Sequence, residues 1–187
     1  MKQMITPLKK QTRQKHLSRL YFLAKGCKQV PPKLTGGKIL WAHPDGYFLN
    51  QYGQKIKHTY SPAHSTPGRH CHNGIRGNTY PTMRHFGGKD CHVLICVTFH
   101  GPRPTVNGIR YECDHINGDP TDYRACNLEW VTPAENRKRA KILRAMRKAG
   151  NDPRNLSPAR LKTIFARFEL MDGAAQMEYE CTHHCEV

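Results

Sequence analysis

The pattern of hydrophobic and polar positions predicts strands in the first half of the chain. Residues 39–60 contain short aromatic and β-branched runs separated by PDG and QYGQ, which is typical of strands joined by turns. Residues 61–78 are rich in Pro, Gly, His and Arg and predict a loop. NTYPTM (78–83) again favours a strand, and HFGGKD (85–90) predicts a turn.

The second half predicts helices as well as strands. Asp90 suits the N-cap of a short helix, CHVLICVTF, which is apolar on nearly every side and is therefore expected to be buried. HGPRPTVNG then predicts a loop. A strand ending in IRYECDH (109–115), a polar loop, INGDPTDYRAC, and a second strand, LEWVT, follow.

Two further helices have clear signals. Thr132 is the expected N-cap of the first, with Pro133 at its first position and Glu135 completing a capping box, and Gly150 is a natural C-terminal stop. The last helix is expected to begin at Ser157 and Pro158. Its apolar residues recur at helical spacing: Leu161, Ile164, Phe165 and Phe168.

The first segment, residues 1–38, has ten Lys or Arg residues and no acid. Two states are open for it: a basic amphipathic helix, or a disordered and solvated tail. In the helix, four apolar residues would line part of one face: Leu17, Leu20, Tyr21 and Leu23. VPPKLTGG (30–37) would break any helix and is typical of a linker.

Composition and charge narrow the function. The 187 residues suffice for one domain or two small ones, and a hydrophobic share of 37% predicts a modest core. The formal net charge is +16, and 16 of the 30 Lys and Arg residues precede Asp90 against one acid, Asp45. Such an excess calls for a polyanion, and nucleic acid is the first candidate. The sequence has neither an apolar run long enough for a membrane span nor a signal-peptide core, so we expect an intracellular protein.

A cluster of polar residues, CDHINGDP (113–120), gathers acids around a histidine in this basic chain. Its members and near neighbours are Asp114, His115, Asn117, Asp119 and Asp122. Hydrolysis of a phosphodiester needs an activated water, a Lewis acid on the phosphoryl oxygen and stabilisation of the leaving 3′-oxygen. A neutral histidine is a natural base near pH 7, and a hard cation such as Mg²⁺ needs few protein oxygen ligands. The cluster therefore has the residue types that this reaction requires.

The longer stretch DHINGDPTDYRACNLEWVTPAEN resembles the HNH endonucleases, one branch of the His-Me (ββα-metal) finger nucleases. It looks closest to the phage and intron-encoded homing enzymes. The Asp-His pair, the NGD loop, the NLEWVT strand and the following Asn carry the resemblance. CHVLICVTFHGPRP resembles the helix that precedes the motif in that branch, and HPDGYFLNQYGQKIK loosely resembles a small β module that often precedes HNH domains.

The resemblance implies roles for four residues. His115 would be the general base and Asp114 a metal ligand. Asn127, 12 residues after His115, would hold the other imidazole nitrogen through its backbone or side chain, and Asn136, 21 residues after His115, would be the second metal ligand. The cofactor would be one divalent ion, Mg²⁺ or Mn²⁺. Adjacent strand residues point to opposite faces, so Asp114 and His115 can serve one site only if the strand ends there, and the loop from Ile116 supplies that end.

Other residues are expected to support this site. Asn117, Gly118, Asp119 and Asp122 would shape the loop, because Asn-Gly and Asp-Pro are turn formers. His92 is expected to pack near the core. Six cations would contact DNA phosphates, the alternative being a solvated helix face. They are Arg137, Lys138, Arg139, Lys141, Arg144 and Arg147.

The C-terminal segment is less informative. SPARLKTIFARFELMDGAAQ (157–176) resembles the first helix and turn of the helix-turn-helix that often ends homing relatives, but MEYECTHHCEV (177–187) is short and acidic and supplies no convincing recognition helix. Recognition of a specific DNA sequence would then depend on the basic N-terminal half of the chain. CTHHC (181–185), with Cys71 or His72, would be a zinc site, but its spacing fits no standard ligand pair, and a flexible tail is favoured.

We therefore predict an α+β protein with four segments: a basic N-terminal segment and linker (1–38), a small β-rich DNA-binding region (39–87), an HNH ββα-metal nuclease domain (88–150), and a C-terminal helix with a Cys/His tail (151–187). The expected activity is metal-dependent hydrolysis of double-stranded DNA to 5′-phosphate and 3′-hydroxyl ends, by a nicking monomer or a homodimer. It would act in the cytoplasm of a bacterial host, from a phage or mobile-element gene. The alternatives are a non-catalytic DNA-binding or regulatory protein of this fold, a zinc-stabilised nucleic-acid adaptor, and an RNA substrate.

Overall fold

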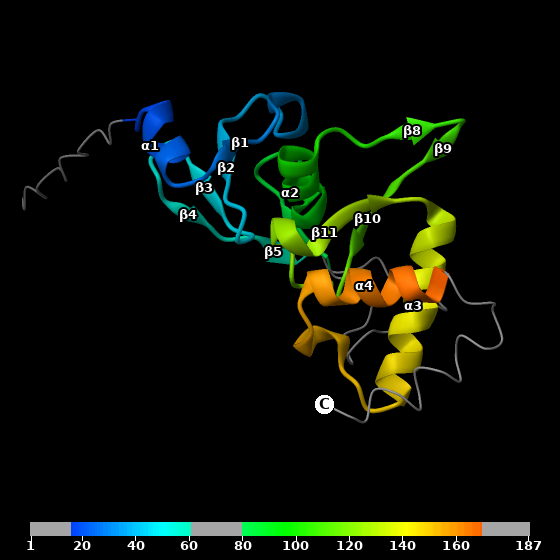
Figure 1. Ribbon diagram of the computed structural model, residues 1–187. Coiled ribbons are helices and arrows are strands. Elements are labelled where there is room, and N and C mark those ends of the chain that lie inside the picture. The colour runs from blue at the N-terminus through cyan, green and yellow to red at the C-terminus, as the bar shows by residue number, and fades with distance from the viewer. Residues whose placement is uncertain (1–15, 61–79, 170–187) are drawn as a thin grey trace, which may run out of the picture.

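The computed structural model describes residues 16–60 and 80–169, which combine helices and strands as an α+β fold (Figure 1). All of its sheets are antiparallel. One sheet has the order β1 (Lys28–Gln29), β2 (Leu40–Ala42), β3 (Phe48–Asn50), β4 (Lys55–Ile56), and another has β5 (Thr59–Tyr60), β6 (Pro81–Met83), β7 (Lys89–Asp90). Two hairpins pair β8 (Thr105–Val106) with β9 (Ile109–Arg110) and β10 (Glu112–His115) with β11 (Leu128–Val131).

The helices are α1 (Arg19–Ala24), α2 (Cys91–His100), α3 (Pro133–Lys148) and α4 (Pro158–Glu169), with short 3-10 turns η1 (Pro32–Leu34), η2 (Ala125–Asn127) and η3 (Pro153–Asn155). None of the helices within the described ranges is long and apolar enough to cross a membrane.

The expected strand–loop–strand–helix unit is confirmed as β10, β11 and α3. In the ladder, Asp114 lies opposite Glu129 and His115 opposite Leu128. The Thr132 hydroxyl accepts a 3.2 Å hydrogen bond from the backbone N–H of Glu135, which caps the first turn of α3. The expected strand at 109–115 is instead two strands, β9 and β10. The loop expected before it contains β8, because Asn107 and Gly108 adopt positive φ values of 50° and 74° and form a tight hairpin turn.

One core joins the N-terminal sheet to the ββα unit. Leu94 and Ile95 of α2 are fully buried and belong to the same cluster as Leu40, Phe48 and Leu128. Helix α2 thus lies between the four-stranded sheet and the β10–β11 hairpin, as expected for a helix that is apolar on nearly every side. The predicted segments 39–87 and 88–150 therefore share one core.

A second core lies between α3 and α4, which cross each other (Figure 1). The four apolar residues expected on one face of the last helix are all buried: Leu161, Ile164, Phe165 and Phe168. They pack with Ile142, Leu143 and Met146 of α3, and Ile116 from the loop after β10 joins them. This packing of Ile116 fixes the start of the loop that follows the Asp-His pair.

The N-terminal expectations need correction. Helix α1 has six residues and buries Phe22, whose ring stacks on Trp41 with 4.4 Å between centroids. The four residues expected to form its apolar face are exposed: Leu17, Leu20, Tyr21 and Leu23. The stretch expected as a linker, 30–37, contains η1 and buries Val30 and Thr35, because β1 pairs with β2 around it.

Candidate active site

Asp114 and His115 end strand β10 and point to opposite sides of the hairpin. The Asp114 carboxylate lies toward α3, where its Oδ2 is 3.5 Å from Nη1 of Arg139. The His115 ring lies toward α2, with its centroid 4.9 Å from that of His92 and 6.0 Å from that of Tyr80. The chain leaves the strand at Ile116, as expected, but strand alternation holds up to His115, so the end of the strand does not bring the two side chains onto one face.

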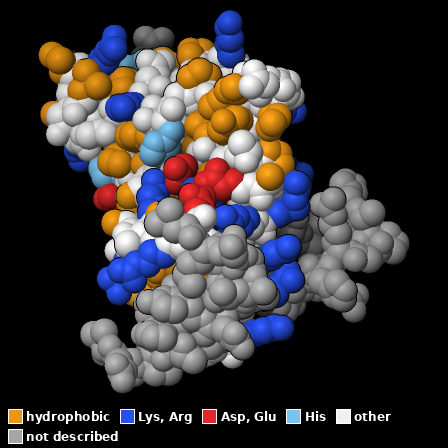
Figure 2. Space-filling model, turned by 45° about the vertical axis from the view of Figure 1, so that its right-hand side comes forward, with side chains coloured by type: hydrophobic (Ala, Val, Ile, Leu, Met, Phe, Trp, Pro, Cys, Tyr) orange, Lys and Arg blue, Asp and Glu red, His pale blue; other side chains and the backbone are white. Residues whose placement is uncertain are grey.

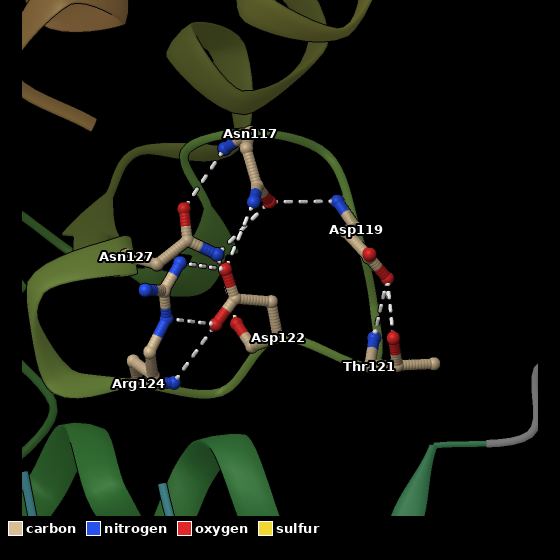
Figure 3. Close-up of polar contacts among 6 residues, drawn as sticks. All are labelled: Asn117, Asp119, Thr121, Asp122, Arg124 and Asn127. Atoms are coloured by element: carbon tan, nitrogen blue, oxygen red, sulfur yellow. Dashed lines mark hydrogen bonds and ion pairs between the residues drawn. The ribbon is translucent and has the colours of Figure 1, made fainter. Parts of the chain in front are cut away.

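The loop after the Asp-His pair is braced by its own side chains (Figure 3). Asn117 Oδ1 accepts from the Asp119 N–H at 2.9 Å, and Asn117 Nδ2 donates to Asp122 Oδ2 at 3.0 Å. Asp119 Oδ1 accepts from both the backbone N–H and the hydroxyl of Thr121. Arg124 donates twice to Asp122, at 2.8 and 2.7 Å. The expectation that these acids shape the loop is confirmed.

Asn127 ties this loop to the residues that directly follow strand β10. Its side chain is fully buried, and Nδ2 donates to Asn117 Oδ1 at 2.9 Å and to the Asp122 carbonyl at 2.8 Å. Its Oδ1 accepts from the Asn117 N–H, and its carbonyl accepts from the Ile116 N–H. Asn127 thus fixes both residues that follow His115. Among the described residues Asn127 makes no hydrogen bond to the His115 ring, so the structure does not show the expected contact with the imidazole nitrogen, and Asn127 bonds instead to the two residues after the histidine.

His115 is a buried, neutral imidazole. Burial lowers the pKa of His115 to about 4, although the charges of Asp119 and Asp122 raise it. Its Nε2 is buried and has no hydrogen-bond partner among the described residues. Burial, followed by the charges of His115 and Arg103, lowers the pKa of His92 to about 3. Both rings are therefore uncharged at neutral pH, and the expected packing role of His92 is confirmed.

Arg139 is the centre of a buried charge cluster that the sequence did not predict. Its side chain is 8% exposed and pairs with Asp114, with Glu129 at 3.2 Å and with Glu135 one turn earlier. Its guanidinium also lies 5.1 Å from the centre of the Phe165 ring of α4. Figure 2 shows acidic side chains gathered in the middle of one face, with Lys and Arg side chains on both sides of them.

This placement separates Arg139 from the other cations of its helix. The five remaining candidates for phosphate contact are exposed: Arg137, Lys138, Lys141, Arg144 and Arg147. Arg139 was expected to join them, but its guanidinium faces carboxylates and is enclosed, so it is a charge-balancing residue of the fold. Helical spacing offered a signal for this, because Glu135 and Arg139 are four residues apart.

The donor atoms at the expected metal position suit a hard cation. Asp114 Oδ2 is buried and accepts no hydrogen bond from any residue that the structure describes. Burial raises the pKa of Asp114 to about 6, although Arg139 lowers it. Asn136 donates from Nδ2 to Glu112 Oε2 at 2.7 Å, which turns its amide oxygen away from Glu112. A carboxylate and an amide oxygen are ligands of the kind that Mg²⁺ prefers.

Nitrogen and sulfur ligands do not gather at this position. Among residues 16–60 and 80–169, no group of three or more His, Cys, Asp or Glu side chains is placed to hold a metal ion. A Mg²⁺ ion that keeps several waters and shares the substrate phosphate does not need such a group. The CTHHC segment and its suggested partners, Cys71 and His72, lie outside the described residues.

Sequence reasoning missed three other members of the site. Tyr80 lies 4.6 Å from His92 between ring centroids, and no local pattern connects it to either histidine. The geometry of the hairpin offered a signal for the other two, Glu112 and Glu129. Glu112 is two residues before Asp114 and so lies on the same face, and Glu129 is the cross-strand partner of Asp114. Glu129 further binds Lys162 of α4 at 3.0 Å.

Comparison with known proteins finds a family model that matches the part of the chain that carries this arrangement. Residues 89–138, from β7 to the first turns of α3, match the family model described as HNH endonuclease. The matched segment contains Asp114, His115, Asn127 and Asn136, and it indicates a nuclease domain. No curated protein and no solved structure matches the chain.

Proposed function

We propose that the protein is a metal-dependent endonuclease that hydrolyses phosphodiester bonds of double-stranded DNA. The observation that carries the proposal is the end of strand β10, where a buried carboxylate and a neutral histidine occupy the last two positions, one on each side of the hairpin, before a braced loop. The first turn of α3 brings Asn136 to the same strand through its bond to Glu112. The match of residues 89–138 to HNH endonucleases supports the same reaction class.

His115 would act as the general base. Because Nε2 is enclosed, the attacking water would approach the other ring nitrogen, Nδ1, and Nε2 would carry the ring proton. The water would lose its proton to Nδ1 as it attacks phosphorus in line with the leaving 3′-oxygen. The products would be a 5′-phosphate and a 3′-hydroxyl. Asn127 would keep the ring in place by fixing Ile116 and Asn117.

The metal would be held by the Asp114 carboxylate and the Asn136 amide oxygen. A bound Mg²⁺ or Mn²⁺ supplies Lewis-acid polarisation of the phosphoryl group and neutralises charge on the leaving oxygen. Arg139 would keep Asp114 in position and balance its charge together with that of Glu129.

Duplex DNA is proposed as substrate because the cations are exposed and numerous. Six of them lie on α3 beyond Asn136, so the helix that would supply a ligand also presents charges to the phosphates next to the cleaved bond. The basic first half of the chain would extend this contact. Binding that rests on phosphates should weaken steeply as salt is raised.

One site of this kind cuts one strand, so a monomer would nick and a homodimer would be needed to cut both strands together. The homing subtype, the phage or mobile-element origin and the cytoplasmic location are supported by the resemblance of the DHINGDP and NLEWVT stretches to that branch. They remain predictions.

The plasmid-nicking assay tests the proposal. Supercoiled plasmid is incubated at low salt with Mg²⁺, Mn²⁺ or EDTA and with wild type, His115→Ala, or His85→Ala as an exposed control. We expect wild type and His85→Ala to give nicked circles only with metal, and His115→Ala to bind the plasmid without nicking it. Equal nicking by His115→Ala would remove the proposed base.

Arg139 favours one rival function. A guanidinium 3.5 Å from Asp114 occupies a position where it balances the carboxylate without a metal, as a retired nuclease that only binds DNA would require. Retardation of the plasmid that is unchanged by EDTA, with no nicking in either metal, would support that non-catalytic function.

A further inference from the structure

The β8–β9 hairpin, residues 105–110, is a projecting arm with an apolar tip. It extends from the body of the protein in Figure 1. Val106 and Ile109 face each other across its ladder and are 50% and 48% exposed. Asn107 is the one non-glycine residue with positive φ in the described ranges, and with Gly108 it makes the tight turn that suits a twisted hairpin. Two exposed β-branched side chains at such a tip contribute nothing to the cores.

The root of the arm is fixed to the catalytic hairpin. The Tyr111 N–H donates to the Pro104 carbonyl at 3.2 Å, which closes the arm at its base. The Trp130 indole donates to the Gly101 carbonyl at 3.1 Å, and the Arg103 guanidinium lies 5.3 Å from the centre of the Trp130 ring. Since only Tyr111 separates β9 from β10, the arm and His115 are parts of one continuous extended segment.

The surface beside the arm is basic. A cleft of about 580 Å³ separates it from η1 and α2, and its lining includes four cations and one acid, Asp90. The cations are Lys33, Lys89, Arg103 and Arg110. Six apolar residues also line the cleft: Pro31, Leu34, Val93, Val97, Pro102 and Trp130. Four cations against one acid favour a partner that carries negative charge. A DNA duplex is such a partner, because phosphates flank the groove into which an apolar tip can enter.

We propose that the β8–β9 arm is a second DNA-contacting element that inserts Val106 and Ile109 into the minor groove and partly unstacks the duplex beside the cleaved bond. The inference rests on the proposed function, in that the substrate is duplex DNA. Arg103 and Arg110 contact the phosphates on either side of the insertion. Aliphatic wedges flanked by cations are a general means of kinking DNA from the minor groove.

The length of the segment sets where the insertion occurs. His115 is six positions after Ile109 in the chain, and an extended chain rises about 3.3 Å per residue, so the tip lies at most about 20 Å from His115. Successive base pairs rise by about 3.4 Å along the axis of the duplex, which places the unstacked step within roughly six base pairs of the cleaved phosphodiester.

A topology assay in EDTA tests the arm without any need for cleavage. Relaxed closed-circular plasmid is bound by protein at low salt, treated with a topoisomerase that works in EDTA, freed of protein and run on a gel. Unstacking unwinds the duplex, so wild type should leave a changed linking number. Val106→Thr/Ile109→Thr keeps the β-branched shape of the exposed tip and should give a roughly threefold smaller change at equal plasmid retardation, since the apolar wedge is lost.

Two further variants sharpen the result. Leu20→Ser/Leu23→Ser removes another exposed apolar pair, from α1, and should behave as wild type. Ile109→Phe enlarges the wedge and should keep or increase the linking change. An unchanged linking number with the wild-type protein bound, or equal changes for wild type and the Thr double variant, would overturn the inference. So would a Thr double variant that loses only self-association in sedimentation.

The assay separates this inference from the proposed function. Failure to nick in Mg²⁺ with a linking change in EDTA would refute the nuclease and leave the arm intact. Nicking in Mg²⁺ without a linking change would refute the arm alone. Failure of the wild type to retard duplex plasmid at all would refute both.

Discussion

The guanidinium of Arg139 lies 3.5 Å from the carboxylate of Asp114 and is enclosed by two further acids and the Phe165 ring. Four elements meet at this one side chain: β10, β11, α3 and α4. The candidate metal ligand is therefore positioned by the helix that follows the motif and by the C-terminal helix packed on it. We therefore expect the stability of the fold and the proposed activity to depend on the same residue.

Arg139→Met should destabilise the protein by about 3 kcal/mol, because it leaves the buried carboxylate of Asp114 without its cation, whereas Glu129 keeps its ion pair with Lys162. Urea unfolding at pH 7.5 measures the loss. Arg137→Met, at an exposed position of the same helix, should change the free energy of unfolding by less than about 0.5 kcal/mol. Equal stabilities of the two variants would show that the cluster does not hold the fold together.

Asp114→Asn should weaken binding of Mn²⁺ by at least roughly tenfold, since the one charged ligand of the proposed site is lost. Titration followed by electron paramagnetic resonance of free Mn²⁺ measures the affinity without any substrate. Asp45→Asn, at an exposed turn, is the matched control and should bind as wild type. Unaltered Mn²⁺ affinity in Asp114→Asn would place the metal elsewhere.

Asn127→Ala should cost about 2 to 3 kcal/mol of folding free energy, because it removes a fully buried amide and leaves Asn117 and the Asp122 carbonyl without their partners. Thermal or urea unfolding measures this. Nicking should fall as well, since the backbone after His115 loses its brace. Asn155→Ala on the surface serves as control, and a loss in the control as large as in Asn127→Ala would contradict the account.

The two buried histidines should make the fold sensitive to acid. In the folded protein the pKa of His92 is about 3 and that of His115 about 4, against an ordinary value of 6.5. At pH values between the folded and unfolded pKa, the unfolded chain binds protons that the folded chain does not. The contribution of the two neutral histidines to the free energy of unfolding is therefore complete above pH 6.5 and is lost as the pH falls. Asp114, whose pKa is raised to about 6, acts in the opposite direction.

Comparison of variants isolates the histidine effect. His92→Phe removes one titrating ring and keeps an aromatic side chain at the buried position. Its free energy of unfolding should decline less than that of wild type between pH 7.5 and pH 5, by about 2 kcal/mol. His85→Phe, at an exposed turn, should follow the wild-type curve. Parallel curves for wild type and His92→Phe would mean that His92 is not held neutral.

Local signals in the sequence were sufficient for the elements of the site. Turn formers, the Thr132 cap and the two short strand runs on either side of the polar loop predicted the ββα unit and the loop held by Asn117 and Asp122. Contacts between distant segments were not predictable in this way. Tyr80 reaches His115 across 35 residues, and Arg139 was classed with its exposed neighbours because helical position alone does not show which face packs on Glu129.

The N-terminal errors have the same cause. A short amphipathic run does not show which of its apolar residues will be buried. In α1 the buried residue is Phe22, because its ring stacks on that of Trp41. The hairpin at 105–110 was missed because Pro and Gly around it favour loops, although Asn-Gly is itself a hairpin turn signal.

Chemical rescue of His115→Ala tests the central claim most directly. Removal of the ring leaves space at the end of β10, and added imidazole can take its place as a base. We predict that imidazole restores metal-dependent plasmid nicking to His115→Ala in proportion to the concentration of neutral imidazole, and does not restore it to Asp114→Ala. Nicking by His115→Ala at the wild-type rate without imidazole would contradict the assignment of His115 as the base.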